Sequence, residues 1–218
     1  MGFEIIEKTA VICMDDGKVN AVGYDFINAI YEAMDRSLEE ANALIITGRP
    51  GMLSGGFDLG EFKKGPEATM KLVGEGARMM HRLFTHPQPL IMACTGHAIA
   101  AGAFMLLASD TRVGAQGNFK IGLNETAIGM TLPVFGVELA TTRLSKRHVT
   151  QAMVQAQIYN PDGACAAGFL DEVVAAEEMM PRAMEHAAVL GGYSTEAYAA
   201  NKLALRKPVA ERIAASLR

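Results

Sequence analysis

The chain has 218 residues, half of them hydrophobic, and a formal net charge of −4. This length and composition suit one large domain with a sizeable core, and the weak negative charge disfavours nucleic acid, which rewards a basic surface. The N-terminus has no basic segment followed by an apolar run, and no uninterrupted apolar stretch reaches the roughly 20 residues needed to span a bilayer. We therefore expect a soluble, cytoplasmic protein with neither a membrane nor a nucleic-acid partner.

The three cysteines, Cys13, Cys94 and Cys165, lie far apart in the sequence, and each sits among apolar residues. Their separation does not match metal-ligand spacing, and free cysteine is commonly buried. We expect reduced core residues and no metal site.

The first half of the chain alternates predicted strands and helices. Residues 3–16 predict two short strands with a turn near Glu7–Lys8, and residues 66–87 predict an amphipathic helix stopped by Pro87. Residues 43–48 and 89–96 are almost entirely apolar and end in glycine, which indicates strands buried on both faces. Residues 21–41 predict another helix, because apolar side chains recur there at helical spacing: Phe26, Ile27, Ile30, Ala33, Met34 and Leu38.

This alternation predicts an α/β fold with a mostly parallel sheet and a site at the C-terminal ends of strands. Residues 111–123 look strand-like and are punctuated by glycine. From Pro133 onward the chain looks mainly helical, with a short strand at 171–174 and two final helices at about 179–190 and 195–217. We expect residues 1–145 to form the core that holds the site, and residues 146–218 to form a helical oligomerisation region.

Two glycine-rich segments follow predicted strands and precede predicted helices: "SGGFDLGEF" (54–62) and "GHAIAAGAFMLL" (96–107). Small residues allow close approach to a ligand, and a helix start presents unpaired N–H groups with a partial positive charge. Two such donors converging from different strands would form an oxyanion hole. Alternatively, the glycines only permit tight packing of helix on strand. No glycine pattern typical of a dinucleotide or nucleoside triphosphate site occurs.

Four motifs occur in order along the chain: "DDGKVNA" (15–21), "SGGFDLGEF", "TGHAIAAG" (95–102) and "IGLNETAIGM" (121–130). With them the sequence resembles the crotonase (enoyl-CoA hydratase/isomerase) superfamily, from about Phe3 to at least Val174. The resemblance implies a spiral of β-β-α turns and a C-terminal helical region that forms trimers or dimers of trimers. It also implies an acyl-CoA thioester as substrate and no cofactor beyond the coenzyme A that the substrate carries.

The resemblance further implies that the backbone N–H groups of Phe57 and Ala101 hold the thioester oxygen. The family usually has a small residue at the first position and glycine at the second, so this chain departs at both. A phenylalanine there would either crowd the acyl chain or turn its ring away. The remaining residues expected to bind substrate are Lys18, Asn20, Gly56, Gly102 and Met130.

The acid–base residues of the family point to a particular reaction. Hydratases of this family use two glutamates, of which one matches Glu125 here and the other is replaced by Phe104. This pattern looks like the mitochondrial-type 3,2-enoyl-CoA isomerases, which carry a similar "LNET" segment. One carboxylate between C2 and C4 is able to move a proton from the first carbon to the second, whereas hydration is better served by two carboxyl groups.

We therefore predict an isomerase that shifts a 3-enoyl-CoA double bond to the 2-position, with Glu125 as base. Three alternatives stay open: a hydratase that uses Glu125 alone, a non-catalytic acyl-CoA-binding protein, and a merely structural loop carboxylate at Glu125. Asn124 would either orient that carboxylate or make a turn.

Other polar residues have simpler interpretations. Asp58 is expected to cap a helix. Asp110 is expected to be structural, pairing with Arg112 or a backbone amide, and His97 to be a packed side chain. Glu138 is a candidate second acid that would reopen hydratase chemistry. The C-terminal pair Arg206–Lys207 would either hold the 3′-phosphate of coenzyme A or form a solvated basic face.

Overall fold

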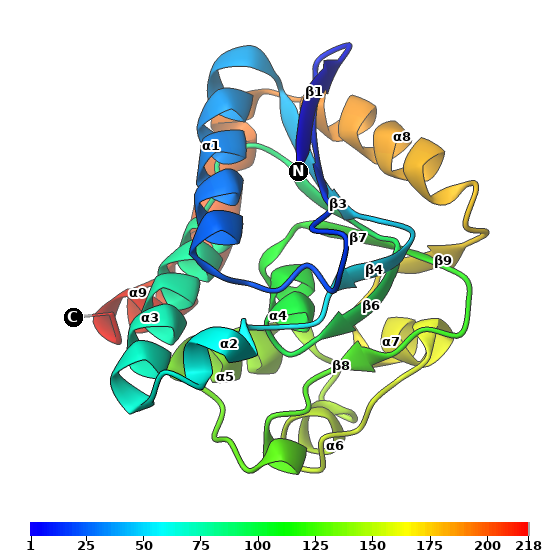
Figure 1. The fold of residues 1–218 in the computed structure, drawn as a ribbon. Coiled ribbons are helices and arrows are strands. Elements are labelled where there is room, and N and C mark those ends of the chain that lie inside the picture. Colours follow the sequence, from blue (N-terminus) through cyan, green and yellow to red (C-terminus); the bar gives the residue numbers. More distant parts are fainter. Residues whose placement is uncertain (218) are drawn as a thin grey trace.

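The computed structural model describes residues 1–217 as an α/β fold with two β-sheets and surrounding helices (Figure 1). The larger sheet has six strands in the order β1-β2-β3-β5-β7-β9, and within it only β1 and β2 pair antiparallel. The α/β arrangement with a mostly parallel sheet is thus confirmed. The six strands are β1 (Gly2–Ile6), β2 (Thr9–Met14), β3 (Ala43–Gly48), β5 (Leu90–Cys94), β7 (Thr111–Ala115) and β9 (Glu172–Val174).

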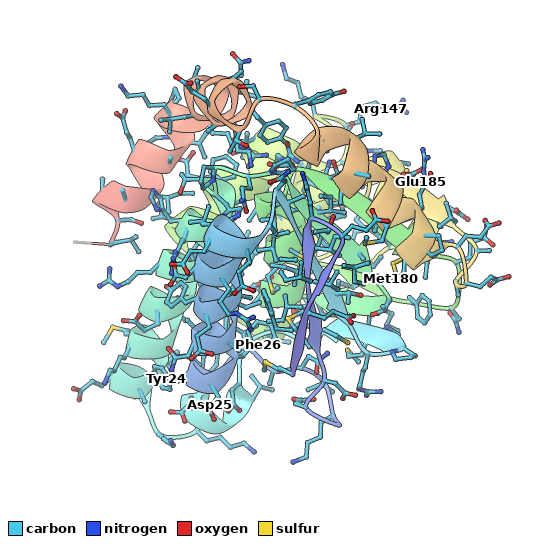
Figure 2. All side chains as sticks on the ribbon, turned by 90° about the horizontal axis from the view of Figure 1, so that it is seen from above. Tyr24, Asp25, Phe26, Arg147, Met180 and Glu185 are labelled. Carbon is cyan, nitrogen blue, oxygen red and sulfur yellow. The ribbon has the colours of Figure 1, made fainter. Side chains whose placement is uncertain are left out.

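Helices cover both faces of this sheet, which explains why its central strands β3 and β5 are buried at every position. Alternate side chains of a strand point to opposite faces. Ile12 and Ile46 join the main core, whereas Val11 and Ile45 pack in a second cluster with α8 (Met179–Gly191). Figure 2 shows α1, labelled at Tyr24, Asp25 and Phe26, on one side of β1, and α8, labelled at Met180 and Glu185, on the other.

The helices of the main core begin and end close to the predicted positions. Helix α1 (Tyr24–Glu40) buries the predicted apolar residues except Leu38, which is exposed. Ser37 is buried one position earlier and donates its hydroxyl hydrogen bond to the Met34 carbonyl, so a polar residue faces inward without an unpaired group. Helix α3 (Pro66–Phe84) ends before Pro87, and every residue of α4 (Ala101–Ala108) is buried.

The second sheet is small. No local sequence pattern predicted its strands, but they supply the second strand of each β-β-α turn that the family resemblance implied. This sheet contains three parallel strands in the order β4-β6-β8: β4 (Gly51–Ser54), β6 (Gly96–Ile99) and β8 (Ile121–Gly122). Strand β4 therefore separates the first glycine-rich segment from β3, whereas β6 forms the beginning of the second segment. Strands of two to four residues that contain glycine show no usable period in the sequence. Gly96 must lack a side chain, since a β-carbon there would overlap the backbone of Gly51.

The C-terminal part packs onto the core instead of standing apart from it. Strand β9 extends the large sheet beside β7, and the last helix contacts α3 and α5. Contacts therefore cross the expected boundary at residue 145, while an oligomerisation role for the region stays a prediction. No helix within residues 1–217 has the length and apolarity to cross a membrane. The remaining helices are α2 (Leu59–Phe62), α5 (Val134–Arg143), α6 (Val149–Met153), α7 (Pro161–Ala167) and α9 (Thr195–Ala215).

A buried ion cluster fastens α9 to the core. Asp110 pairs with Lys202 and with Arg206, whose nitrogen lies 2.8 Å from the Asp110 carboxylate. The structural role predicted for Asp110 is confirmed. Of its two predicted partners, the backbone amide is found, because the Leu90 N–H donates to the Asp110 carboxylate at 2.9 Å, whereas Arg112 pairs with Asp171 instead. Arg206 is only 5% exposed, so its guanidinium serves this cluster and does not form part of a surface that meets a coenzyme A phosphate.

Candidate active site

Three segments meet at the C-terminal edge of the small sheet. Residues 55–57 follow β4, residues 100–101 follow β6, and residues 124–125 follow β8. Because the three strands are parallel, their carboxyl ends lie at one edge, which is where α/β proteins place ligands. The backbone N–H of Ala100 donates to the carbonyl of Gly122 at 3.0 Å and so links the second segment to the third.

These segments line a cavity of about 200 Å³. Gly55, Phe57, Ala100, Asn124 and Glu125 contribute from the strand ends. The rest of the wall comes mainly from apolar side chains. Of these, Met130 and Phe104 were identified from the sequence, whereas the others were not: Leu59, Phe62, Val73, Ile128, Thr131 and Pro133. The sequence marks Leu59 and Ile128 only as large apolar residues next to a glycine, and the folded chain shows that both side chains are exposed.

Glu125 is held at this cavity by a tight loop. The Met130 N–H donates to the Glu125 carbonyl at 2.9 Å, and the Thr126 hydroxyl donates to the Met153 carbonyl at 3.1 Å. The Glu125 side chain is buried, and its Oε2 has no hydrogen-bond partner within residues 1–217. Buried polar atoms normally have a partner, so this oxygen is left available for a ligand.

Burial raises the pKa of the Glu125 carboxyl, and the backbone amides of Asn124 and Glu125 only partly offset that shift. Desolvation disfavours the charged form, so the ionised carboxylate is a stronger base here than in water. The Asn124 Oδ1 is also buried without a partner in the described chain, and the unpaired Glu125 Oε2 accepts no hydrogen bond from the Asn124 amide. Both side chains thus present an unpaired oxygen at the cavity wall.

The first two segments touch beside the predicted oxyanion hole. A β-carbon built at Gly56 would lie 3.1 Å from the Ala100 β-carbon and 3.7 Å from the Ala101 nitrogen. The N–H groups of Gly56, Asp58 and Ala100 each donate within the chain. Those of Phe57 and Ala101 have no acceptor among the described residues outside regular helices and strands, and Ala101 opens its helix, where no intrahelical acceptor exists.

Backbone strain at Ala100 shapes this corner. Its φ of +52° and ψ of −117° form a conformation that side-chain-bearing residues rarely adopt. The bend turns the chain from β6 directly into α4 and leaves the Ala101 N–H at the helix start. There the helix dipole adds a partial positive charge, which favours a developing oxyanion.

Phe57 and Phe104, the two phenylalanines that depart from the family pattern, form walls of the cavity. The Phe57 ring lies 6.0 Å from that of Phe62, centre to centre, and packs over Gly76 of α3. The Phe104 ring is buried and meets Phe135 edge-on at 5.3 Å. Where a second glutamate would stand, the cavity therefore has an apolar surface.

Some of the predicted substrate-binding residues lie at the cavity, and others hold the surrounding backbone in place. Met130 lines the cavity, and Gly56 joins the two segments. Gly102 permits close packing, because a β-carbon there would lie 2.5 Å from the Ser54 carbonyl oxygen. Asn20 is fully buried, and its amide donates to the carbonyls of Met14, Met52 and Leu53, whereas Lys18 is exposed in the preceding turn. Asn20 thus fixes β4 with its side chain.

The remaining polar candidates have structural partners. Asp58 caps α2 by accepting from the Gly60 N–H at 2.7 Å, and the Nδ1 of His97 accepts from the Lys120 N–H at 2.9 Å. Glu138 pairs with Arg212 at 2.7 Å and does not line the cavity. The structure therefore does not bring a second acid to Glu125 from that position.

The fold and this site together define a known class of protein. The enoyl-CoA hydratase/isomerase family model matches residues 4–218, so the chain belongs to that family. Human mitochondrial enoyl-CoA delta isomerase 1 is 24% identical over 94% of this chain. The chain spans 69% of that human protein and 62% of the corresponding rat and mouse proteins.

Solved structures agree with the family assignment. An enoyl-CoA hydratase/isomerase family protein from Pseudomonas syringae is 41% identical, with a TM-score of 0.96 over 99% of this chain and 94% of the other. A probable enoyl-CoA hydratase from Mycobacterium tuberculosis is 39% identical, with a TM-score of 0.95 over 99% and 92% of the two chains. The relatives are described as isomerases and as hydratases, so the comparisons establish family and fold and leave the reaction to be argued from the site.

Proposed function

We propose that this protein isomerises 3-enoyl-CoA thioesters to 2-enoyl-CoA thioesters, with Glu125 as its single acid–base residue. One observation carries the proposal: among the cavity-lining residues that the structure describes, Glu125 alone has an ionisable side chain. The rest of the lining is mostly apolar, with only amide and hydroxyl groups in addition. An acid–base step in this cavity therefore falls to one carboxylate.

The proposed reaction moves one proton and conserves the base. The thioester oxygen accepts hydrogen bonds from the N–H groups of Phe57 and Ala101, and the Glu125 carboxylate removes a proton from C2. The C2–H electron pair forms the new double bond to C3, the former C3–C4 pair is protonated at C4 by Glu125, and the carboxylate is regenerated. Each oxyanion-hole donor is worth about 2.7–4 kcal/mol to such a transition state.

Hydration is better served by two acid–base groups, whereas the described residues line this cavity with one. Adding water requires one group to activate the water and another to deliver a proton. The Phe104 ring occupies the place of the second carboxyl group, packed against Phe135, and Glu138 is engaged by Arg212. These contacts favour isomerisation over hydration.

The reaction is tested by supplying both unsaturated thioesters in separate assays without any added cofactor. We expect 3-hexenoyl-CoA to yield the conjugated 2-hexenoyl thioester, seen as a rise in ultraviolet absorbance, and 2-hexenoyl-CoA to be hydrated much more slowly. Faster hydration than isomerisation would contradict the assignment. Tight binding of both thioesters with no turnover would instead indicate a non-catalytic acyl-CoA-binding protein.

We also propose that the subunits assemble as trimers or as dimers of trimers. The support is the apolar surface that the C-terminal helices expose, including Val189, Tyr193, Leu203 and Leu205. Solvent-exposed apolar clusters of this kind commonly mark subunit contacts. Light scattering at micromolar concentrations is expected to give at least three times the chain mass, and a monomer would contradict the proposal.

A further inference from the structure

A second apolar groove adjoins the active-site cavity. It has a volume of about 290 Å³ and lies between α3, the start of α5 and the residues that follow α9. Val73 and Pro133 line both the cavity and the groove. The two spaces are therefore adjacent, and the two residues that line both are uncharged.

One of the two glycines in α3 is not required by the packing of the described chain. Helix α3 contains Gly74 and Gly76, although glycine is a poor helix former. Gly76 is accounted for, because a β-carbon there would lie 2.5 Å from Cζ of Phe57. A β-carbon at Gly74 would meet nothing within 4 Å, and Gly74 lines the groove. Gly74 therefore adds width to the groove without serving the packing of the described chain.

The rim of the groove is apolar where a solvated surface would be polar. Met70 is 68% exposed and Val134 is 50% exposed, and both line the groove. Among the lining residues that the structure describes, Arg78 alone is charged, and it directs a hydrogen bond to the Leu217 carbonyl at 3.3 Å. An occupant would thus meet mainly hydrocarbon, which suits an aliphatic chain.

We propose that this groove binds the distal part of the substrate's own acyl chain, and that the protein therefore prefers long-chain thioesters. The inference rests on the proposed function for the position of the thioester. A chain with C1 at Phe57 and Ala101 and with C2–C4 at Glu125 fills the cavity first. Its continuation passes the shared wall of Val73 and Pro133 and lies against Gly74.

The test measures binding, so that it does not depend on turnover. Calorimetry compares saturated hexanoyl-CoA with dodecanoyl-CoA, neither of which is isomerised. Full burial of one methylene is worth about a fourfold gain in affinity, so we expect roughly twofold per added carbon in a groove open on one side. Equal affinities for the two thioesters would overturn the inference even if 3-hexenoyl-CoA is isomerised as proposed.

A matched pair of variants at one position locates the chain. Gly74→Leu fills the groove, whereas Gly74→Ala makes the same backbone change and adds one methyl group. We expect Gly74→Leu to weaken dodecanoyl-CoA binding by about tenfold, which at roughly twofold per carbon corresponds to about three to four displaced carbons, and to leave hexanoyl-CoA binding unchanged. Gly74→Ala is expected to bind both thioesters like the unmodified protein.

Two results would overturn the assignment of the occupant. If Gly74→Leu weakened both thioesters equally, the groove would not hold the distal chain. If Gly74→Leu changed the assembly mass by light scattering while chain-length preference stayed constant, the groove would be a contact between copies of the chain. The two proposals fail separately. If 3-hexenoyl-CoA is not isomerised but Gly74→Leu still abolishes the preference for the longer thioester, the proposed reaction is refuted and the proposed binding site is retained.

Discussion

The ring of Phe57 lies against the backbone of Gly76, so closely that a β-carbon at Gly76 would stand 2.5 Å from Cζ of the ring. This contact joins the segment that follows β4 to the middle of α3. The phenylalanine that departs from the family pattern is therefore accommodated by a glycine elsewhere in the chain. Because the same residue offers its N–H to the proposed oxyanion hole, the packing of the ring also fixes the direction of that donor.

Gly76→Ala is expected to displace the Phe57 ring and to lower kcat for 3-hexenoyl-CoA by about tenfold, a partial loss of one donor's contribution of about 2.7–4 kcal/mol. The control is Gly74→Ala, which makes the same change in the same helix without a neighbour to displace. The double variant Gly76→Ala/Phe57→Leu keeps the backbone donor, removes the clash and should regain activity. Equal activity of the two single glycine variants would show that the ring does not position the donor.

Phe104→Glu tests whether a missing acid explains the absence of hydration. The variant places a carboxyl group beside Phe135 and in contact with Gly136, in a buried position. Burying a charge without a partner is costly, so the melting temperature should fall. If the variant stays folded, hydration of 2-hexenoyl-CoA should rise while Phe104→Leu shows no gain. Rapid hydration by the unmodified protein would remove the basis for this prediction.

The pH dependence of activity should report Glu125. The base must be ionised, and burial raises its pKa above the ordinary value of 4.5, so kcat/KM should fall as the pH drops through the raised pKa. In the unfolded chain the carboxyl ionises at its lower, ordinary pKa. Ionisation in the folded protein is therefore unfavourable, and stability is lost as pH rises from the unfolded toward the folded pKa.

A stability measurement on Glu125→Gln checks the sign of this linkage. Relative to the unmodified protein, the variant should be more stable at about pH 8, and this advantage should shrink at about pH 4, where the carboxyl is mostly protonated in both states. Urea unfolding at the two pH values measures the difference. A constant difference at both would mean that burial does not shift this carboxyl.

Asp110→Asn should destabilise the fold, because it leaves the buried cations Lys202 and Arg206 without their carboxylate. Removing one partner of a buried ion pair typically costs about 3–5 kcal/mol. The control is Glu211→Gln on α9, the helix that carries Lys202 and Arg206. Glu211 pairs with Lys207 at an exposed position, and this pair should be worth less than about 1 kcal/mol. Similar urea midpoints for the two variants would show that the buried cluster does not anchor α9.

The sequence predicts best those elements whose residues repeat a local pattern. The apolar runs that became β3 and β5, and the helical spacing of α1 and α3, were identified because burial on defined faces leaves a periodic trace. The strands β4, β6 and β8 leave no such trace, since they span two to four residues and are interrupted by glycine. Yet these short strands bring the site segments together.

The site itself was predicted mainly from the family resemblance. Nothing local distinguishes Glu125 from a loop carboxylate, and only the folded chain shows that its side chain is buried and that one oxygen lacks a partner. For a related reason, the sequence did not predict the cations that pair with Asp110. Its carboxylate and Lys202 are 92 residues apart, and such pairings depend on how distant helices pack.

The most direct test of the account is the rate of 3-hexenoyl-CoA isomerisation by Glu125→Gln, measured together with the affinity of the variant for hexanoyl-CoA. Glutamine has nearly the same shape but cannot accept the C2 proton, and acid–base steps contribute about 10²–10⁴-fold each. We predict that affinity is retained and that kcat falls by several orders of magnitude, because one residue carries out both proton transfers. A folded variant that still isomerises 3-hexenoyl-CoA at the rate of the unmodified protein would contradict the account.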